Sequence, residues 1–219
     1  MGYITVIGAG SWGTTLAYLL SAKDFDISLW VYEESLAEEI KNTRINSLYL
    51  PDISLPENIK VTHRMDEAVA KARYVLNVVP SQHTRSIFKE AFSYMPAEAI
   101  IISAAKGIER GTLMTVSSVL KEISDHPVAV LSGPSFAKEV IKKMPTAVTL
   151  ATEDKETGLL LQEVFNNNHF RVYTHDDMLG VEIGGALKNV MAIASGISDG
   201  LGLGHNARAA LITRGLAEM

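Results

Sequence analysis

The chain has 219 residues, of which 47% are hydrophobic and 21% are charged, the composition of a soluble globular protein with a substantial core. A net charge of −5 without a basic block argues against nucleic-acid binding, and the lack of cysteine excludes disulfides and thiolate–zinc sites. No run of about 18 apolar residues is present, which excludes a membrane-spanning helix, and no signal-peptide pattern opens the chain, so we expect a cytoplasmic protein.

Short, wholly apolar runs alternate with helical patterns over most of the chain. The apolar runs cover residues 3–7, 27–31, 74–79, 99–103, 128–131 and 147–151. The segments with helical spacing cover residues 14–22, 35–42, 66–71, 84–91 and 112–123. Apolar runs without polar alternation are typical of strands that are buried on both faces of a parallel sheet. The alternation therefore predicts an α/β domain with a doubly wound, Rossmann-type parallel sheet.

The pattern changes near residue 176, after which no strand signal is found. Two helical stretches, 179–198 and 207–219, are separated by the glycine-rich segment DGLGLGHN. We therefore expect residues 1–177 to form the Rossmann-type domain and residues 178–219 to begin an all-helical second domain. No capping signal follows the last helical residues, so we expect the chain to stop within that second domain.

The first apolar run leads directly into a glycine-rich turn of the form GxGxxG. Gly8 permits the tight turn, Gly10 lets the backbone approach a pyrophosphate, and Gly13 lets the following helix pack closely on the strand. The amino terminus of that helix favours anionic phosphates. A strand before the motif and a helix after it predict a dinucleotide site rather than a purely structural turn.

An acidic residue, Glu33, follows the second apolar run, twenty residues after Gly13. A carboxylate at this position accepts hydrogen bonds from the ribose hydroxyls of the adenosine and repels a 2′-phosphate. This favours NAD over NADP as the cofactor. The alternative interpretation is that Glu33 and Glu34 only form an acidic, solvated helix start.

Further polar residues follow other apolar runs, where ligands of open α/β sheets bind. Lys106 lies where it could hold a phosphate or carbonyl oxygen, although loop lysines of this kind are often only solvated. In the segment SGPSFA, Pro134 suggests the first turn of a helix, Ser132 or Ser135 could cap that helix, and Ser135 could also bind a ligand. The histidines lack metal-ligand spacing and GxSxG is absent, so we expect neither a metal site nor a serine-hydrolase triad.

The segment GVEIGGALKNVM places one lysine among residues that have almost no side chain. On a helix, Lys188 shares a face with Gly184, Gly185 and Ala192. Close helix packing would explain the small residues but not the lysine, because a buried charge without a partner is costly. We interpret the small residues as space for a ligand toward which Lys188 points.

Six segments together resemble the NAD(P)-dependent glycerol-3-phosphate dehydrogenase family over essentially the whole chain. They are GAGSWGT, NSLYLP, NVVPSQ, SAAKG, LSGPSFAKEV and the long carboxyl-terminal segment from GVEIGGALKNVM to GLAEM. The resemblance implies hydride transfer between a nicotinamide and dihydroxyacetone phosphate, which yields the sn-glycerol 3-phosphate used in phospholipid synthesis. It also implies a phosphorylated triose as substrate, a homodimer, and further residues with an aspartate partner for the lysine and an arginine–asparagine pair for the phosphate.

The resemblance also assigns roles to individual residues. Lys188 matches the catalytic lysine, which exchanges a proton with the substrate oxygen and whose pKa nearby cations such as Lys106 would lower. The substrate side comprises Lys106, Gly133, Ser135, Lys188 and Asn189. The cofactor side comprises Gly8, Gly10, Ser11, Trp12, Gly13, Tyr32, Glu33, Tyr49, Lys106 and Ala137.

Two alternatives remain open at this point. The chain could be a catalytically incomplete dinucleotide-binding module that binds NADH without turnover. It could also be a related two-domain dehydrogenase that acts on a hydroxy acid or on ketopantoate, since those families share the Rossmann half and a helical lysine.

Overall fold

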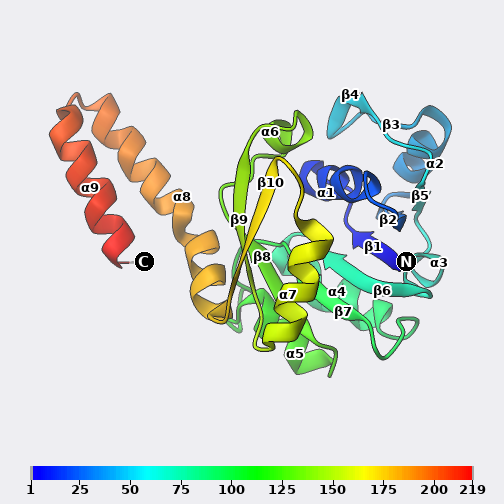
Figure 1. Cartoon of the computed structure of the whole chain (residues 1–219). Coiled ribbons are helices and arrows are strands. Elements are labelled where there is room, and N and C mark those ends of the chain that lie inside the picture. Colours follow the sequence, from blue (N-terminus) through cyan, green and yellow to red (C-terminus); the bar gives the residue numbers. More distant parts are fainter. Residues whose placement is uncertain (1, 219) are drawn as a thin grey trace.

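The computed structural model describes residues 2–218 and consists of a helix-flanked sheet followed by two long helices (Figure 1). The strands are β1 (Tyr3–Ile7), β2 (Asp26–Trp30), β3 (Ile45–Asn46), β4 (Leu50–Ser54), β5 (Ile59–Thr62), β6 (Ala72–Asn77), β7 (Ile100–Ser103), β8 (Val128–Ser132), β9 (Thr146–Ala151) and β10 (Phe170–His175). The helices are α1 (Ser11–Ser21), α2 (Glu34–Thr43), α3 (Met65–Val69), α4 (Ser81–Ala91), α5 (Val116–Ile123), α6 (Ala137–Ile141), α7 (Lys155–Phe165), α8 (Met178–Gly200) and α9 (Gly204–Glu218).

The main sheet has eight strands in the order β10-β9-β8-β7-β6-β1-β2-β5. The chain leaves β1 toward β2 and β5 on one side and later continues on the other side of β1 with β6, β7 and β8, which is the doubly wound arrangement predicted. All neighbouring strands are parallel except β8 and β9, which are antiparallel. The predicted Rossmann-type sheet is therefore confirmed as mostly parallel, with β9 and its parallel neighbour β10 running opposite to the other six strands. Only the five-residue helix α6 lies between β8 and β9, and the chain re-enters the sheet at the edge where β8 ended.

Side chains that alternate along the strands build two hydrophobic clusters, one on each face of the sheet. Ile4 and Val6 of β1 belong to the cluster covered by α1, α2 and α7, whereas Ile7 belongs to the cluster covered by α3, α4 and α5. Leu16 and Phe88 are fully buried on opposite faces. Each such side chain contributes about 1.5–3 kcal/mol relative to an exposed position. This two-sided burial explains why the strands have no polar alternation.

The structure also contains elements that apolar runs did not indicate. In β10, buried Phe170 and Val172 alternate with exposed Arg171 and Tyr173, the pattern of an edge strand rather than of a doubly buried one. Helix α7 begins where the side chain of Asp154 accepts a hydrogen bond from the backbone of Thr157 at 2.7 Å. The two-stranded β3–β4 hairpin is mostly exposed and too short for a periodic signal.

Helix α5 begins at Val116, four residues later than the helical spacing predicted. Leu113 has a left-handed backbone with φ of 58°, and Thr115 pairs with Ile108 in an isolated bridge. Thr115 then caps the helix by accepting a hydrogen bond from the backbone of Ser118. Residues 107–115 therefore form a loop that folds back on itself before α5 begins.

Helices α8 and α9 form a hairpin that extends away from the sheet (orange and red in Figure 1). Only the start of α8 is embedded in the α/β part, where Met178 and Glu182 are buried. Gly215 of α9 lies against Met191 of α8 so closely that a Cβ atom there would come 2.0 Å from the methionine methyl group. The two predicted helical stretches are thus confirmed up to residue 218, with a short break at residues 201–203, and residue 219 lies outside the described residues.

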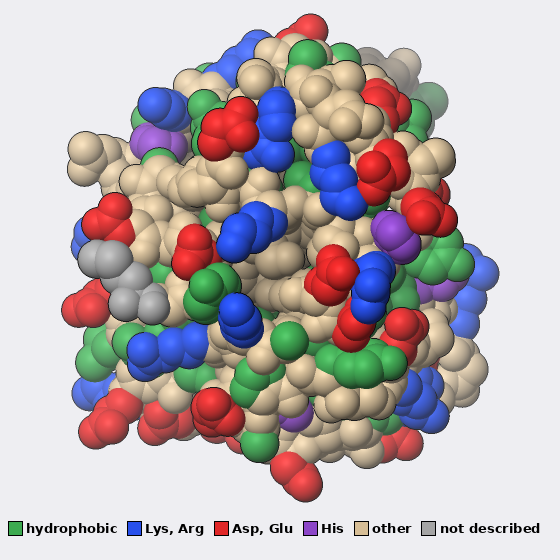
Figure 2. Space-filling model, turned by 90° about the vertical axis from the view of Figure 1, so that its right-hand side faces the viewer, with side chains coloured by type: hydrophobic (Ala, Val, Ile, Leu, Met, Phe, Trp, Pro, Cys, Tyr) green, Lys and Arg blue, Asp and Glu red, His purple; other side chains and the backbone are tan. Residues whose placement is uncertain are grey.

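Charged side chains of both signs are distributed over the exterior. Figure 2 shows them interspersed on the face that carries α2, α3 and β5. Among residues 2–218, none of the helices combines the length and the apolar character that crossing a membrane requires.

Candidate functional site

The glycine-rich turn between β1 and α1 has the geometry of a phosphate site. Gly8 has a φ of +112°, and a Cβ atom on Gly13 would lie only 1.8 Å from the carbonyl oxygen of Gly8. Gly10 precedes α1, has open space where its Cβ would be, and no side chain caps the helix. The backbone N–H groups of the first turn are therefore available to an anion, which fits a dinucleotide pyrophosphate.

Side chains from three segments surround this turn. The hydroxyl of Ser11 donates to the backbone oxygen of Tyr49 at 3.3 Å, which brings the β3–β4 hairpin over the turn. The indole N–H of Trp12 is buried and has no acceptor among the described residues. The ammonium group of Lys106 lies 5.7 Å from the centre of the Trp12 ring. A buried donor without an acceptor next to a cation is suited to an anionic or carbonyl ligand.

Asn46 holds the turn in place and was not indicated by sequence. Its side-chain amide donates to the backbone oxygen of Ala9 at 2.8 Å and to the hydroxyl of Thr14 at 2.9 Å. The residue is completely buried. Asn46 lies within the segment NSLYLP, but its partners are more than thirty positions away, so only the fold reveals the contact.

A groove of about 400 Å³ lies beside the turn at the end of β2. It brings together four of the predicted cofactor residues, namely Gly8, Tyr32, Glu33 and Tyr49. It is completed by residues that were not predicted for the cofactor site: Trp30, Val78, Val79, Pro80, His83, Ser86 and Ile87. Its mixture of aromatic and aliphatic walls with a few polar groups suits a nucleoside.

Glu33 lies at the mouth of this groove and precedes α2. It occupies the N-cap position, but its side chain makes no capping hydrogen bond. The neighbouring Tyr32 is 72% exposed and meets Trp30 edge to face, with 6.0 Å between the ring centres. The carboxylate is therefore exposed and uncommitted to the helix, so both interpretations of Glu33, ribose contact and acidic helix start, are compatible with its position.

Lys106 connects the turn to the helical part of the chain. Burial, and secondarily the positive charge of Lys188, lower the pKa of Lys106 from its ordinary value. The next residue, Gly107, has a φ of +133°, and a Cβ atom there would come 2.6 Å from the hydroxyl of Ser81. Lys106 thus projects from a sharply turned backbone at the carboxyl-terminal edge of β7.

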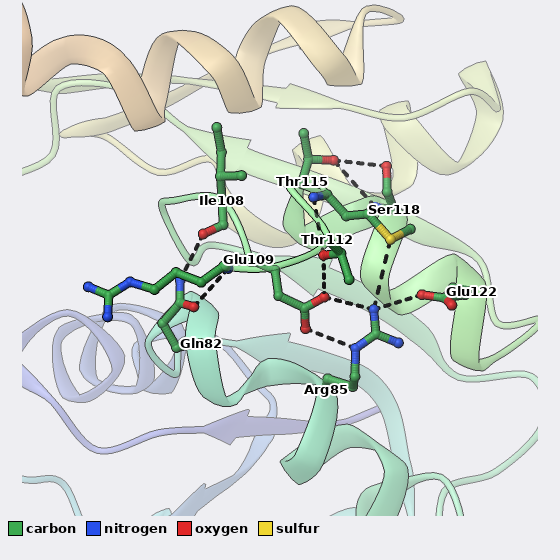
Figure 3. Close-up of polar contacts among 10 residues, drawn as sticks. Gln82, Arg85, Ile108, Glu109, Thr112, Thr115, Ser118 and Glu122 are labelled. Carbon is green, nitrogen blue, oxygen red and sulfur yellow. Dashed lines mark hydrogen bonds and ion pairs between the residues drawn. The ribbon is translucent and has the colours of Figure 1, made fainter.

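An ion-pair network holds the loop that follows Lys106 (Figure 3). The guanidinium of Arg85 binds both carboxylate oxygens of Glu109 at 2.9 and 2.8 Å, and also binds Glu122 of α5 at 2.7 Å. Hydrogen bonds from Arg85 and then from Thr112 lower the pKa of Glu109 to about 2. The glutamates in turn raise the pKa of Arg85. This bidentate pair joins α4, the loop and α5 into one unit.

Gln82 adds a second connection between α4 and the same loop. Its side-chain amide donates to the backbone oxygen of Ile108 at 2.7 Å, and its amide oxygen accepts from the backbone of Arg110 at 2.9 Å. Sequence reasoning missed this network because its members are 24 to 37 positions apart. The sequence feature that could have indicated this network is that two of the segments shared with the family, NVVPSQ and SAAKG, lie next to its members.

The segment after β8 differs from its prediction. Helix α6 begins at Ala137 with Phe136 as N-cap, so Pro134 does not lie in a first turn, and neither Ser132 nor Ser135 caps the helix. The hydroxyl of Ser135 instead donates to the backbone oxygen of Gly133 at 3.3 Å. The backbone bends at Gly133 before it can become helical, which delays the helix start.

Gly133 and Ala137 lie at contacts between elements of the fold and not in the groove beside the turn. Gly133 has a φ of +150°, and a Cβ atom there would lie 2.9 Å from the Cα atom of Val148, so β9 leaves no room for a side chain. Ala137 is the first residue of α6, a helix that packs on α1. Neither residue lines the groove that contains Glu33.

Lys188 lies on an exposed part of α8. Its ammonium group donates to the side-chain oxygen of the adjacent Asn189 at 2.7 Å. Gly184 has open space around it, whereas a Cβ atom on Gly185 would come 2.6 Å from the hydroxyl of Ser132 and 3.8 Å from the Cγ atom of Lys106. Each interpretation of the small residues therefore fits one glycine. Gly185 permits close packing of α8, and Gly184 borders free space beside Lys188.

Comparison with protein families gives two matches that together cover nearly the whole chain. Residues 3–158 match the model of the NAD-dependent glycerol-3-phosphate dehydrogenase N-terminus. Residues 177–219 match the model of the C-terminus of the same family.

Individual relatives agree with the family models. The chain is 54% identical to a glycerol-3-phosphate dehydrogenase [NAD(P)+] of Citrifermentans bemidjiense and 52% identical to that of Geobacter sulfurreducens. In both comparisons the match covers 99% of this chain and 66% of the relative.

Solved structures give the same result. The crystal structure of glycerol-3-phosphate dehydrogenase from Coxiella burnetii superposes with a TM-score of 0.91 at 41% identity, covering 99% of this chain and 67% of that one. The Plasmodium falciparum enzyme gives a TM-score of 0.93 at 25% identity, with 99% and 64% covered. A ketopantoate reductase from Ralstonia eutropha, at 16% identity and a TM-score of 0.63, shares the fold alone.

This chain therefore belongs to the NAD-dependent glycerol-3-phosphate dehydrogenase family, and it spans about two thirds of the length of the curated relatives that it matches.

Proposed function

We propose that the protein carrying this chain interconverts dihydroxyacetone phosphate and sn-glycerol 3-phosphate, with NAD(H) as its preferred cofactor. The observation that carries the proposal is the position of Lys106, which lies over Trp12 of the phosphate turn and against Gly185 of the helix that bears Lys188. Two cations and a dinucleotide turn meet at one edge of the sheet. This arrangement suits the reduction of a phosphorylated ketone, because cations stabilise the negative charge of the phosphate and of the carbonyl oxygen.

Lys188 is proposed as the catalytic acid and base. A bound nicotinamide supplies or accepts the hydride at the central carbon of the triose. As the carbonyl becomes an alcohol, the ammonium group of Lys188 donates a proton to its oxygen, and in the reverse direction the neutral amine takes that proton back. Asn189 accepts a hydrogen bond from the same ammonium group and so keeps its orientation.

The remaining residues are proposed to bind and orient the two ligands. On the substrate side, Lys106 would attract the phosphate or the carbonyl oxygen, and the polar groups of Gly133, Ser135 and Asn189 would line the pocket. On the cofactor side, the turn residues Gly8, Gly10, Ser11, Trp12 and Gly13 would hold the pyrophosphate, Tyr32, Glu33 and Tyr49 the adenosine, and Lys106 and Ala137 the remainder. The exposed, uncapped carboxylate of Glu33 supports a preference for NAD over NADP.

The activity can be tested directly with the complete natural polypeptide. Mixing it with NADH and dihydroxyacetone phosphate should consume NADH and produce sn-glycerol 3-phosphate, whereas ketopantoate and simple 2-keto acids should give far slower turnover. Calorimetric binding of NADH without any turnover would overturn the proposal in favour of a nucleotide-binding module. Faster turnover of ketopantoate or of a keto acid would reassign the substrate.

The organisation of the whole protein is proposed in the same way. We place the boundary between the cofactor domain and the helical domain at residues 177 and 178, a division supported by the end of β10 and the start of α8. Exposed apolar side chains on the α8–α9 hairpin support a homodimer: Val190, Ile193, Ile197, Leu201, Leu203, Ile212 and Leu216. Light scattering of the purified protein would measure its mass, and fractionation would test its location in the cytoplasm.

A further inference from the structure

Glu182 is a buried carboxylate at the base of α8 that the proposed reaction does not use. It is 6% exposed, and no cationic side chain between residues 2 and 218 forms an ion pair with it. Burying a carboxylate without hydrogen bonds is very costly, so its partners must account for its presence.

Those partners belong to the first turn of α5. The backbone N–H of Ser117 donates to one oxygen of Glu182 at 2.8 Å, and the hydroxyl of Ser117 donates to the other. A carboxylate at this position also faces the positive end of the helix dipole. Glu182 thus connects α8 to the amino terminus of α5 through two charge-assisted hydrogen bonds.

Helix α5 is in turn part of the unit that carries Lys106. Arg85 binds Glu122 of α5 and Glu109 of the loop after Lys106, as Figure 3 shows. The same carboxylate, Glu182, lies one helical turn before Gly185, where α8 meets Ser132 and Lys106. The anchor and the closest approach of α8 to Lys106 therefore lie on the same side of the helix.

We propose that Glu182 is a positioning residue that sets the rotation and height of α8, and thereby places Lys188 relative to Lys106 and the bound cofactor. This inference rests on the proposed function of Lys188. Lys188 lies one turn beyond Gly185 on a continuous helix, so a movement at the anchor displaces its ammonium group directly. A displacement of about 1 Å at a reacting group is enough to lower a rate by about 100-fold.

The test compares Glu182→Ala, Glu182→Gln and Ser117→Ala with the unchanged protein and with the control Glu57→Gln. Glu57 is exposed in the connection between β4 and β5 and carries the same chemical change away from both α5 and α8. Glu182→Ala should lower kcat at least 10-fold while the Kd for NADH changes less than twofold. Glu182→Gln keeps an acceptor for the Ser117 N–H and should restore most of the rate, and Ser117→Ala should give a smaller loss.

Amide hydrogen exchange across residues 178–192 supplies a readout that does not depend on turnover. Exchange there should accelerate in Glu182→Ala and remain unchanged in Glu57→Gln. If kcat and exchange both stay at their original values in Glu182→Ala and Ser117→Ala, the positioning role is wrong. If the unchanged protein does not oxidise NADH with dihydroxyacetone phosphate, the proposed function fails, while the exchange result still decides whether Glu182 anchors α8.

Discussion

Lys106 and Lys188 place positive charge at the same edge of the sheet, and the surroundings of Lys106 destabilise its charged form. Lys106 is partly buried, and both its burial and the charge of Lys188 lower its pKa. Trp12 offers it an aromatic face, which compensates only part of the lost hydration. An anionic ligand between the lysines would remove this cost, which is the physical reason to expect a phosphorylated substrate there.

Replacing Lys188 by methionine tests the catalytic assignment. Lys188→Met should lower kcat by about 100-fold to 10,000-fold, the range typical of a lost general acid, with NADH affinity nearly unchanged. The pKa of Lys106 should rise toward its ordinary value, because one of the two causes of its lowering is removed. Steady-state kinetics and NMR titration of isotopically methylated lysines would measure both effects. Lys155→Met, at an exposed site of α7, is the control; an equal effect there would contradict the assignment.

Replacing Glu33 by arginine tests the cofactor preference. An arginine could bind the 2′-phosphate of NADPH through charge-assisted hydrogen bonds of about 1.5–3 kcal/mol, and about 1.4 kcal/mol corresponds to a factor of ten. The ratio of kcat/KM for NADPH to that for NADH should therefore rise about tenfold or more. Glu34→Arg makes the same change of charge at the next residue, whose side chain faces His63 instead of the groove. Equal ratios in the two variants would show that Glu33 does not contact the ribose.

At the scale of elements, the loop between β7 and α5 acts as a unit with α4 because of the Arg85–Glu109 pair. The loop contains a left-handed residue at Leu113 and a single bridge between Ile108 and Thr115. Such a loop has little regular hydrogen bonding of its own, so ion pairs and Gln82 contribute much of its order. The position of Lys106 therefore depends on side chains from two neighbouring helices.

Replacing Glu109 by glutamine should change the acid sensitivity of the protein. The pKa of Glu109 is lowered from 4.5 to about 2, so its pair stabilises the fold fully above about pH 4.5 and loses this effect as the pH falls toward 2. The difference in unfolding free energy between the original protein and Glu109→Gln should be largest near neutral pH and shrink on acidification. Urea unfolding at several pH values would measure it. The exposed control Glu57→Gln should show no such difference, and a constant gap for Glu109→Gln would contradict the assignment.

At the scale of the whole molecule, the proposed chemistry requires α8 to lie closely against the end of β8. Gly185 makes this approach possible, because a Cβ atom there would come 2.6 Å from the Ser132 hydroxyl. The remainder of α8 and all of α9 contribute little to the core, since none of the described residues of α9 is buried. The relation of Lys188 to the cofactor half is therefore decided within the first three turns of α8.

Replacing Gly185 by alanine should crowd the contact of α8 with Ser132 and Lys106, because the new Cβ atom would come 2.6 Å from the Ser132 hydroxyl and 3.8 Å from the Cγ atom of Lys106. We expect kcat to fall about 10-fold or more while NADH binding is preserved, because small displacements of reacting groups have large effects on rate. Gly200→Ala, at the far end of α8 with open space around it, is the matched control and should leave both quantities unchanged. Stopped-flow kinetics and fluorescence titration with NADH would separate the two effects. A Gly185→Ala protein with normal kcat would show that the close approach is not required.

Much of the architecture follows from the sequence by itself. The apolar runs predicted six of the eight strands of the main sheet, because burial on both faces removes polar residues. GxGxxG predicted the turn, and the structure shows that a Cβ atom on Gly13 would lie 1.8 Å from the Gly8 oxygen. The segments around Lys106 and Lys188 carried much of the resemblance to the family. These signals depend on residues that are neighbours in the chain, so they can be recognised from the sequence without the structure.

Only the tertiary structure decided what depends on contacts between distant residues. It showed that β9 and β10 run opposite to the other strands, since the direction of β9 is set by the short connection through α6 and not by apolar content. It also revealed the Arg85–Glu109 pair and the Glu182–Ser117 anchor, whose partners are 24 and 65 positions apart. These hydrogen bonds form because the fold brings distant groups together, and no periodicity in the sequence indicates which distant residues come into contact.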